Sequence, residues 1–258
     1  MRILRAYKTE LDPNNKQRTL FVKYAGAARF VYNWALADRI ERYKVGEKTD
    51  LYEQKKRFNA LKKIVFPWLD EIAYVVTQEA FQHLDTAYQN FFRRVKSGQN
   101  PGFPIFKSKK HGIGSFAVRG SIVVESNRVK IPRIGWVKLK ERNYLPGENV
   151  KLLYLTISNR ANRWYVSAQV EKEIQIVPAS NPPVGVDFGI NTLAVCSDGK
   201  RFENPHVLRL AESRLKRLQR ELSRRTKGGS NYKKTRIKLA TQHARVADIR
   251  KHILHNIS

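Results

Sequence analysis

The residue best suited to chemistry is Asp187, which lies in the middle of an apolar segment, residues 184–190 (VGVDFGI). A short apolar run bounded by turn residues predicts a buried β-strand. A carboxylate in such a strand is costly to bury unless it pairs with a cation or binds a metal ion. Gly185 and Gly189 would let backbone and substrate approach the strand closely. The pattern therefore predicts a metal ligand at Asp187, with an aspartate that only caps a turn as the alternative.

The residues that follow predict two further strands joined by a turn. Residues 192–196 (TLAVC) and 200–202 (KRF) flank a Ser-Asp-Gly turn at 197–199. An Asp-Gly pair between two strands is the expected hairpin turn, so we interpret Asp198 as structural. An actin-like ATPase also opens with an apolar strand followed by Gly, Asp and Gly, and uses it to hold phosphate. The motif alone leaves that alternative open.

Net charge separates these alternatives. The chain has 258 residues, with 50 Lys and Arg against 22 Asp and Glu and a formal net charge of +28. Such a surplus repels itself unless a polyanion neutralises it, which favours a nucleic-acid partner and gives an ATPase no advantage. A soluble protein that is merely basic is the remaining alternative.

Composition excludes several other classes. Hydrophobic residues make up 41% of the chain, which is enough for a folded core. The single cysteine, Cys196, excludes an intrachain disulfide and a multi-cysteine zinc site, so we expect a reducing compartment. No apolar run is long enough to span a membrane, and the N-terminus lacks the apolar core of a signal peptide. We therefore expect a cytoplasmic location and no membrane partner.

After the three strands, the sequence predicts a basic helical hairpin. Apolar residues recur at three- and four-residue steps from Leu208 to Leu222, the turn falls at 228–230 (GGS), and a second periodic segment continues through residue 253. The apolar seam would pair the two helices. Around it lies more positive charge than the few local acids can neutralise. The candidates for nucleic-acid binding in this hairpin are Arg214, Arg217, Arg224, Arg225 and Lys227.

The N-terminal part, after a short strand at residues 3–7, predicts helices over residues 13–97. Asp12 is the expected helix cap, with Pro13 at the first helical position. Gly26 would break the first helical stretch into two helices. Arg29, Arg93 and Arg94 are candidate phosphate contacts, with an ordinary solvated helix face as the alternative.

Prolines and a glycine end the helical pattern at residues 100–104 (NPGFP). A basic loop follows, in which Lys107, Lys109 and Lys110 are further nucleic-acid candidates. Short β-branched or aromatic segments then predict a small barrel or sandwich. These strands are expected at residues 116–118, 122–124, 129–131, 136–139, 152–157 and 164–170.

Several of these stretches together resemble the OrfB/TnpB proteins of IS200/IS605 transposons, compact RNA-guided DNA nucleases related to the type V CRISPR effectors. Each stretch is weak alone, and the resemblance depends on their order and spacing. They are residues 28–33 (ARFVYN), 86–92 (TAYQNFF), 102–107 (GFPIFK), 131–135 (IPRIG) and 185–190 (GVDFGI).

The resemblance implies an α+β architecture in which a helical recognition lobe is inserted into an oligonucleotide-binding-type β-barrel. An incomplete RNase H-like (RuvC) α/β domain with a helical hairpin would follow. The implied domains are a wedge-type barrel at 1–12 and 99–178, a recognition lobe at 13–98, a linker at 179–183 and the first part of the RuvC domain at 184–258. An older view of the family takes the N-terminal helices as a helix-turn-helix DNA binder, which a break at Gly26 would permit.

The resemblance also implies a guide RNA from the transposon end, double-stranded target DNA as the second partner, and two Mg²⁺ ions at the nuclease site. Asp187 would be its first carboxylate and metal ligand. Gln78, expected to be exposed near a helix start, lies where the family's recognition lobe meets duplex DNA.

The chain departs from the family where a second carboxylate, a zinc ribbon and a third carboxylate would follow, because it stops inside the second hairpin helix. We therefore expect residues 1–258 to bind no zinc and to be inactive alone. The alternative is a non-cleaving RNA- or DNA-binding regulator of transposition or transcription.

Overall fold

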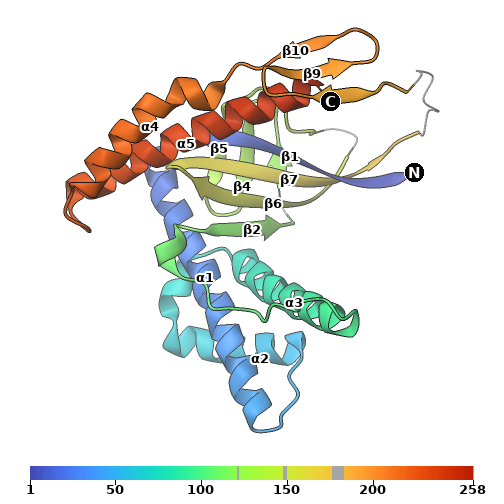
Figure 1. Ribbon diagram of the computed structural model, residues 1–258. Helices are drawn as coiled ribbons and strands as arrows, with labels where there is room; N and C mark the ends of the chain where they lie inside the picture. Colours follow the sequence, from blue (N-terminus) through green and yellow to red (C-terminus); the bar gives the residue numbers. More distant parts are fainter. Residues whose placement is uncertain (121, 148–149, 176–182, 258) are drawn as a thin grey trace. The chain divides into compact units, whose positions relative to one another are not determined.

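The computed structural model describes residues 1–120, 122–147, 150–175 and 183–257, and its contacts divide the chain into two compact units (Figure 1). The N-terminal unit comprises Met1–Asn159 and Arg163–Ile174, and the C-terminal unit comprises Arg160–Asn162 and Gln175–Ser258. Of the linker expected at 179–183, only Pro183 falls within the described residues. Helices and strands both contribute throughout, as the sequence predicted.

A seven-stranded sheet forms the base of the N-terminal unit. The first strand is longer than the five residues predicted, because it pairs with β7 from Arg2 opposite Glu173 to Leu11 opposite Trp164. The other six strands confirm the prediction at nearly the expected positions. The sheet has the order β2-β6-β7-β1-β5-β4-β3, with the bounds β1 Arg2–Asp12, β2 Ser115–Arg119, β3 Val123–Val124, β4 Arg128–Ile131, β5 Gly135–Leu139, β6 Lys151–Arg160 and β7 Arg163–Glu173.

The start of the first helix differs from the prediction. Helix α1 spans Asn15–Lys44, and its cap is Asn14, whose side chain accepts from the Gln17 backbone while the Gln17 side chain accepts from the Asn14 backbone. Asp12 instead ends β1, opposite Lys138. The reason is the burial of Leu11, which is only 2% exposed and lies opposite Trp164, so the chain stays extended until that contact is made.

The predicted break at Gly26 is also wrong, since α1 is continuous through it. A glycine inside a helix costs about 1 kcal/mol relative to alanine. The neighbouring residues Tyr24, Ala25 and Ala27 are fully buried, and this packing outweighs the cost.

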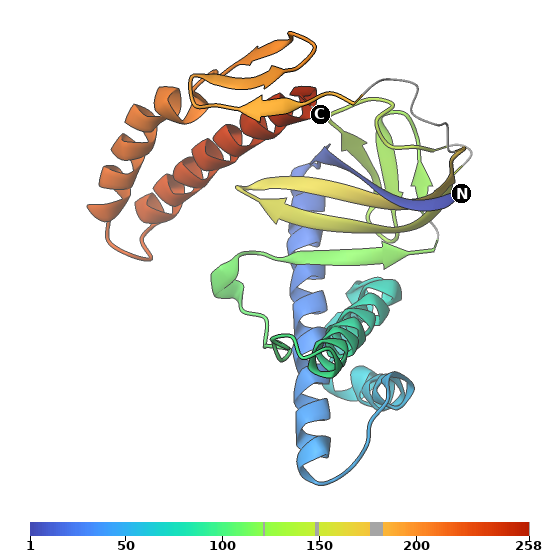
Figure 2. The ribbon, with the colours of Figure 1, turned by 45° about the vertical axis from the view of Figure 1, so that its right-hand side comes forward.

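After α1 come α2 Leu51–Val65, the 3-10 helix η1 Pro67–Glu71 and α3 Tyr74–Lys96. They lie on one side of the sheet, and α1 runs from the sheet out toward them (Figure 2). Edge-on aromatic contacts fill the space between the helices. The ring centroid of Phe58, for example, lies 5.3 Å from that of Phe81 and 4.9 Å from that of Trp34. The same core continues into the sheet, because the ring centroid of Phe21 on α1 lies 5.0 Å from that of Trp164 on β7. Helices and sheet thus share one core.

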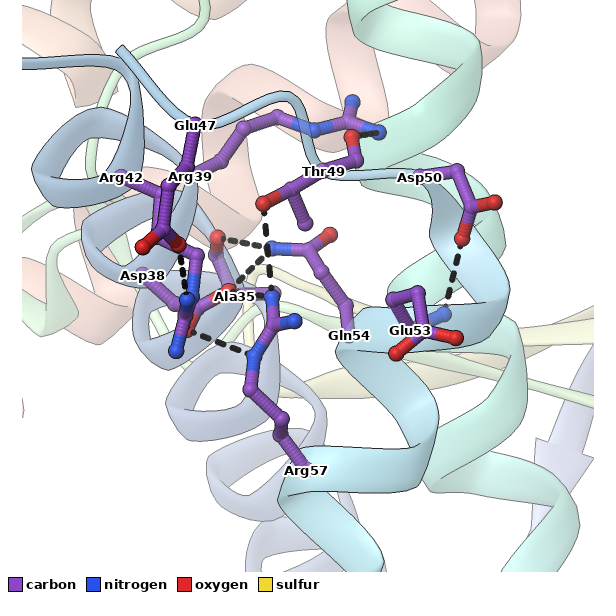
Figure 3. A network of polar contacts seen from close by, with 10 residues as sticks. All are labelled: Ala35, Asp38, Arg39, Arg42, Glu47, Thr49, Asp50, Glu53, Gln54 and Arg57. Carbon is purple, nitrogen blue, oxygen red and sulfur yellow. Dashed lines mark hydrogen bonds and ion pairs between the residues drawn. The ribbon is translucent and has the colours of Figure 1, made fainter. Parts of the chain in front are cut away.

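A polar network fastens α2 to the outer half of α1 (Figure 3). The carboxylate of Asp38 accepts from Arg57 at 2.8 Å, from Gln54 at 3.0 Å and from Arg42 at 3.2 Å. Burial alone would raise the pKa of Asp38, but these hydrogen bonds outweigh it, and its pKa lies below the ordinary value. The buried amide of Gln54 also donates to the Ala35 carbonyl. The ionised form of Asp38 is therefore part of what holds the two helices together.

The C-terminal unit confirms the predicted meander and hairpin. Strands β8 Val186–Phe188, β9 Thr192–Cys196 and β10 Arg201–Glu203 form a sheet of order β10-β9-β8. Helices α4 Val207–Ser223 and α5 Ser230–Ile257 pack through Ala211, Leu215 and Val246. Leu208, expected in this seam, is 48% exposed instead, because the helix has only just begun there.

Candidate functional site

Asp187 lies on β8, at the open edge of the small sheet. It is opposite Val195 of β9, and β9 is the only strand that pairs with β8 in the described part of the chain. Asp187 is exposed, as are the other β8 residues, with Phe188 66% and Val186 44% exposed. The expectation that this strand is buried is therefore wrong for the described residues, because nothing among them covers it. The carboxylate is open to solvent and to an approaching cation.

The glycines beside Asp187 have a local role. A Cβ on Gly189 would lie 2.8 Å from the Thr192 carbonyl oxygen, so the turn between β8 and β9 has no room for a side chain there. Gly185 is less restricted, since a Cβ would meet only the Ser197 side chain, at 3.8 Å. The close approach that Gly189 permits is thus made by the chain's own backbone, not by a substrate.

Asp198 is structural, as predicted. Its carboxylate accepts from the Lys200 backbone at 3.1 Å and pairs with the Lys200 ammonium at 3.0 Å, which closes the β9–β10 turn. The hydrogen bond from the Lys200 backbone is the main reason that the pKa of Asp198 is lowered.

Asp187 can supply one carboxylate ligand to a divalent cation. Within the residues that the structure describes, no group of three or more His, Cys, Asp or Glu side chains lies close enough to hold a metal ion. Two divalent ions need several carboxylates to offset their charge. The described residues thus fit one ligand of a two-metal site and not a complete site, and no catalytic step follows from them.

The hairpin brings four arginines together around a recess of about 540 Å³ at the end of α4. Its lining consists of Arg217, Arg220, Glu221, Arg224 and Arg225. Glu221 is the one acid among them, and its carboxylate accepts from Arg225 at 2.9 Å and from Thr235 of α5 at 3.0 Å. The hydrogen bond from Arg225 is the largest cause of the lowered pKa of Glu221. The recess therefore keeps a positive surplus suited to phosphate groups.

The other two hairpin candidates lie outside this recess. Lys227 shares a second, smaller recess of about 240 Å³ with Arg225 and Tyr232, whereas exposed Arg214 lines neither. Arg220 was missing from the predicted set. Its spacing, three residues after Arg217 and four before Arg224, is the signal that places it on the same helix face.

In the N-terminal unit, Arg29 and Gln78 differ most from the expectation. Arg29 is half-buried and donates to the Ile113 carbonyl at 3.0 Å, so it fastens the backbone before β2. Gln78 lies in the first turns of α3 and is half-buried, not exposed, because this helix packs against β2 and α1. Its amide nitrogen is buried, and no hydrogen-bond partner for it occurs within the described residues.

Lys107 is held in place by α1. The Asn33 side chain donates to its carbonyl at 2.9 Å and accepts from its backbone N–H at 2.8 Å. The ammonium lies 3.9 Å from the ring centroid of Tyr32, where desolvation lowers the pKa of Lys107. Lys109 and Lys110 follow in the 3-10 helix η2, Lys109–His111, and both are exposed. The structure thus places the three lysines beside one another on the chain's return from α3 to β2.

Comparison with family models shows the class of protein that this fold and these sites define. Residues 1–48 match an IS605 OrfB model described as a helix-turn-helix domain, and residues 165–258 match an IS605 OrfB model described as a probable transposase. Both matched segments are thus of the IS605 OrfB type. In the structure, most of the segment matched by the first model is the single continuous helix α1.

Two curated relatives agree with these models. The chain is 32% identical, over all of its own length and 63% of the relative's, to a protein of Escherichia coli strain K12 provisionally named RNA-guided DNA endonuclease InsQ. It is 31% identical, over 99% of its length and 63% of the relative's, to a protein of Streptomyces pristinaespiralis with the provisional name RNA-guided DNA endonuclease. The chain belongs to the IS605 OrfB family. It spans a little under two thirds of the length of these relatives.

A solved structure, the cryo-EM structure of the Cas12f1-sgRNA-target DNA complex, matches 98% of this chain and 68% of that one at 12% identity, with a TM-score of 0.33. A likeness at this TM-score supports no conclusion about function. Separately, no helix within the described residues combines the length and apolar character needed to cross a membrane.

Proposed function

We propose that this chain is the nucleic-acid-binding part of a transposon-encoded RNA-guided DNA endonuclease, whose complete form hydrolyses DNA phosphodiester bonds. One observation carries the proposal: the C-terminal unit contains both the arginine-lined recess of the α4–α5 hairpin and the exposed carboxylate of Asp187 on the edge strand β8. The provisional names of the relatives support the same class, and they favour it over a non-cleaving regulator of transposition or transcription.

Within this proposal, the seven-stranded sheet is the oligonucleotide-binding-type barrel, at residues 1–12 and 99–178. The helices α1, α2, η1 and α3 are the recognition lobe, at residues 13–98. The C-terminal unit, from residue 184 onward, is the first part of a RuvC-type nuclease domain. The insertion of all the N-terminal helices between β1 and β2, within one shared core, supports this division.

The partners in this proposal are a guide RNA from the transposon end and double-stranded target DNA, both met in the cytoplasm. Asp187 would be one ligand of a pair of Mg²⁺ ions, which activate water and stabilise the leaving oxygen in phosphodiester hydrolysis. Within this activity, residues 1–258 bind the nucleic acids. Arg217, Arg224 and their neighbours would neutralise phosphates, and Asp187 would supply its carboxylate.

The salt dependence of RNA binding tests the proposal. If about eight phosphates are neutralised, the affinity of residues 1–258 for a structured RNA falls by roughly a thousandfold or more between about 50 and 200 mM salt. We expect this dependence together with no DNA cleavage by the same chain in Mg²⁺. A log–log salt slope near zero would contradict the binding role.

A further inference from the structure

The C-terminal half of α3 and the segment that follows it form a surface that the proposed function leaves unassigned. Residues 86–124 contain no Asp or Glu, while they contain seven Lys and Arg. After α3 the chain turns at Gly98 and runs back past α1 toward β2 (Figure 1). Its charge is thus of one sign over this stretch, which suits a polyanion such as a nucleic acid.

Four aromatic rings cluster on this surface. The Phe103 ring is edge-on to Tyr88 at 5.7 Å and to Phe91 at 5.3 Å, while Phe92 is stacked near Tyr88 at 6.2 Å. Tyr88 is only 7% exposed, and the Arg39 guanidinium lies 4.5 Å from its ring centroid. The cluster therefore has an anchored inner side, with Tyr88 as its base.

The outer side of the cluster is open. Phe92 is 60% exposed and Phe103 is 49% exposed. The position of Phe103 is constrained, because buried Pro104 follows it and the Asn33 side chain holds the backbone of Lys107 through two hydrogen bonds. Phe92 is constrained by its place within α3, stacked near Tyr88. Rings that are held in place but uncovered lose little conformational freedom when a flat ligand stacks on them.

Cations flank the two open rings. Arg94 reaches the residue before Phe103: its Nη1 atom lies 3.7 Å from where a Cβ on Gly102 would stand. Lys96 follows Phe92 by four residues on α3 and so shares its helix face. Arg93 lies directly beside Phe92 in the chain and is exposed. Aromatic rings interleaved with cations are how proteins hold single-stranded nucleic acid, since bases stack on the rings while the cations contact phosphates.

We propose that Phe92 and Phe103 form a platform on which unpaired bases of an RNA strand stack, with Arg93, Arg94 and Lys96 contacting the adjacent phosphates. The inference rests on the proposed function, which supplies RNA as the partner. Duplex DNA keeps its bases stacked inside the helix, whereas RNA loops and bulges present unstacked bases to aromatic side chains. A neutral or basic protein partner for the two rings is disfavoured by the cations Arg93, Arg94 and Lys96 beside them and by the lack of acids in residues 86–124.

The test replaces Phe92 by leucine, which keeps an apolar side chain on an exposed site and removes the ring. The control is Tyr43→Leu, which removes an exposed ring, 82% exposed, near the end of α1. The probes are a single-stranded RNA of about a dozen nucleotides carrying 2-aminopurine, whose fluorescence falls on stacking, its DNA counterpart, and a fully paired RNA hairpin.

We expect Phe92→Leu to weaken binding of the single-stranded RNA by roughly 5- to 150-fold per stacked base, with less fluorescence quenching. The log–log salt slope should stay as in the wild type, because no charge is removed. Phe92→Trp should restore binding, and Tyr43→Leu should leave it unchanged. Binding of the fully paired hairpin should not respond to the Phe92 variants.

Three results would overturn the platform. Binding of the single-stranded RNA by Phe92→Leu with the wild-type affinity would show that the site accepts any apolar residue, as a protein-binding patch would. An equal loss on the paired hairpin would show that no unpaired base is involved, and tighter binding of the DNA counterpart would show that RNA is not the preferred strand. In each case a steep log–log salt slope for RNA binding by the wild-type protein leaves the proposed function standing. A slope near zero for the wild-type protein would contradict both the platform and the proposed function.

Discussion

Three arginines of the α4 recess, Arg217, Arg220 and Arg224, carry its positive surplus, because Glu221 already accepts from Arg225. Replacing all three by alanine removes three exposed charges, two within α4 and one at its C-cap, and alanine has the highest helix propensity, so α4 should persist. Each phosphate contact contributes about 0.7 to 0.9 to the log–log salt slope, so the slope should fall by about 2 to 3.

The consequence is a change in relative affinity that equilibrium titrations can measure. The advantage of the wild type over the triple variant should shrink by roughly 15- to 40-fold between about 50 and 200 mM salt. The assay is RNA binding by fluorescence anisotropy at several salt concentrations, with helix content checked by circular dichroism.

The matched control changes the same three positions to lysine. Lysine keeps the charge, so the salt slope should stay near the wild-type value even if the loss of bidentate contacts weakens binding. An unchanged slope in the alanine variant would refute the reasoning, because it would mean that the recess does not contact phosphates.

Two further predictions concern the fold that positions these sites. Asp38→Ala should destabilise the N-terminal unit by about 2 to 3 kcal/mol in urea unfolding, since it removes the carboxylate that accepts from Arg57, Arg42 and Gln54 at a site with 13% side-chain exposure. Because the folded pKa of Asp38 is lowered, its contribution is complete above the unfolded pKa near 4, and the difference between wild type and variant should close as pH falls further; a constant difference down to pH 2 would contradict this. Gly189→Ala should disturb the β8–β9 turn and lower the thermal midpoint of the C-terminal unit, whereas Gly185→Ala should be tolerated; equal effects would show that the contact with the Thr192 carbonyl is not limiting.

Local patterns gave much of this fold from the sequence alone. The α4–α5 hairpin and the β8–β10 meander follow from apolar period and turn chemistry, which act over a few residues. The unbroken passage through Gly26 depends on the long-range burial of Tyr24 and its neighbours, which no local pattern shows, so tertiary packing overrides local propensity there. The cap at Asn14 does have a local signal, the Asn14–Gln17 capping box, which the prediction at Asp12 missed.

The candidate sites divide in the same way. The carboxylate at Asp187 and the basic hairpin could be found from residue type and spacing. The grouping of Arg220 with Arg217 and Arg224 around one recess, and the use of Arg29 to hold the Ile113 carbonyl, depend on how helices and loops meet in space. A charged residue on a predicted helix face does not reveal which backbone group it reaches.

The central claim is that Asp187 is a metal-binding carboxylate of an RNA-guided nuclease. The most direct measurement is guided DNA cleavage in Mg²⁺ by this chain extended to the length of its relatives and loaded with its RNA, for the wild type, Asp187→Ala and Asp198→Ala. We predict that Asp187→Ala loses cleavage by more than roughly a hundredfold while keeping RNA affinity, and that Asp198→Ala, which alters only the β9–β10 turn, still cuts. An Asp187→Ala protein that cleaves at the wild-type rate would contradict the account.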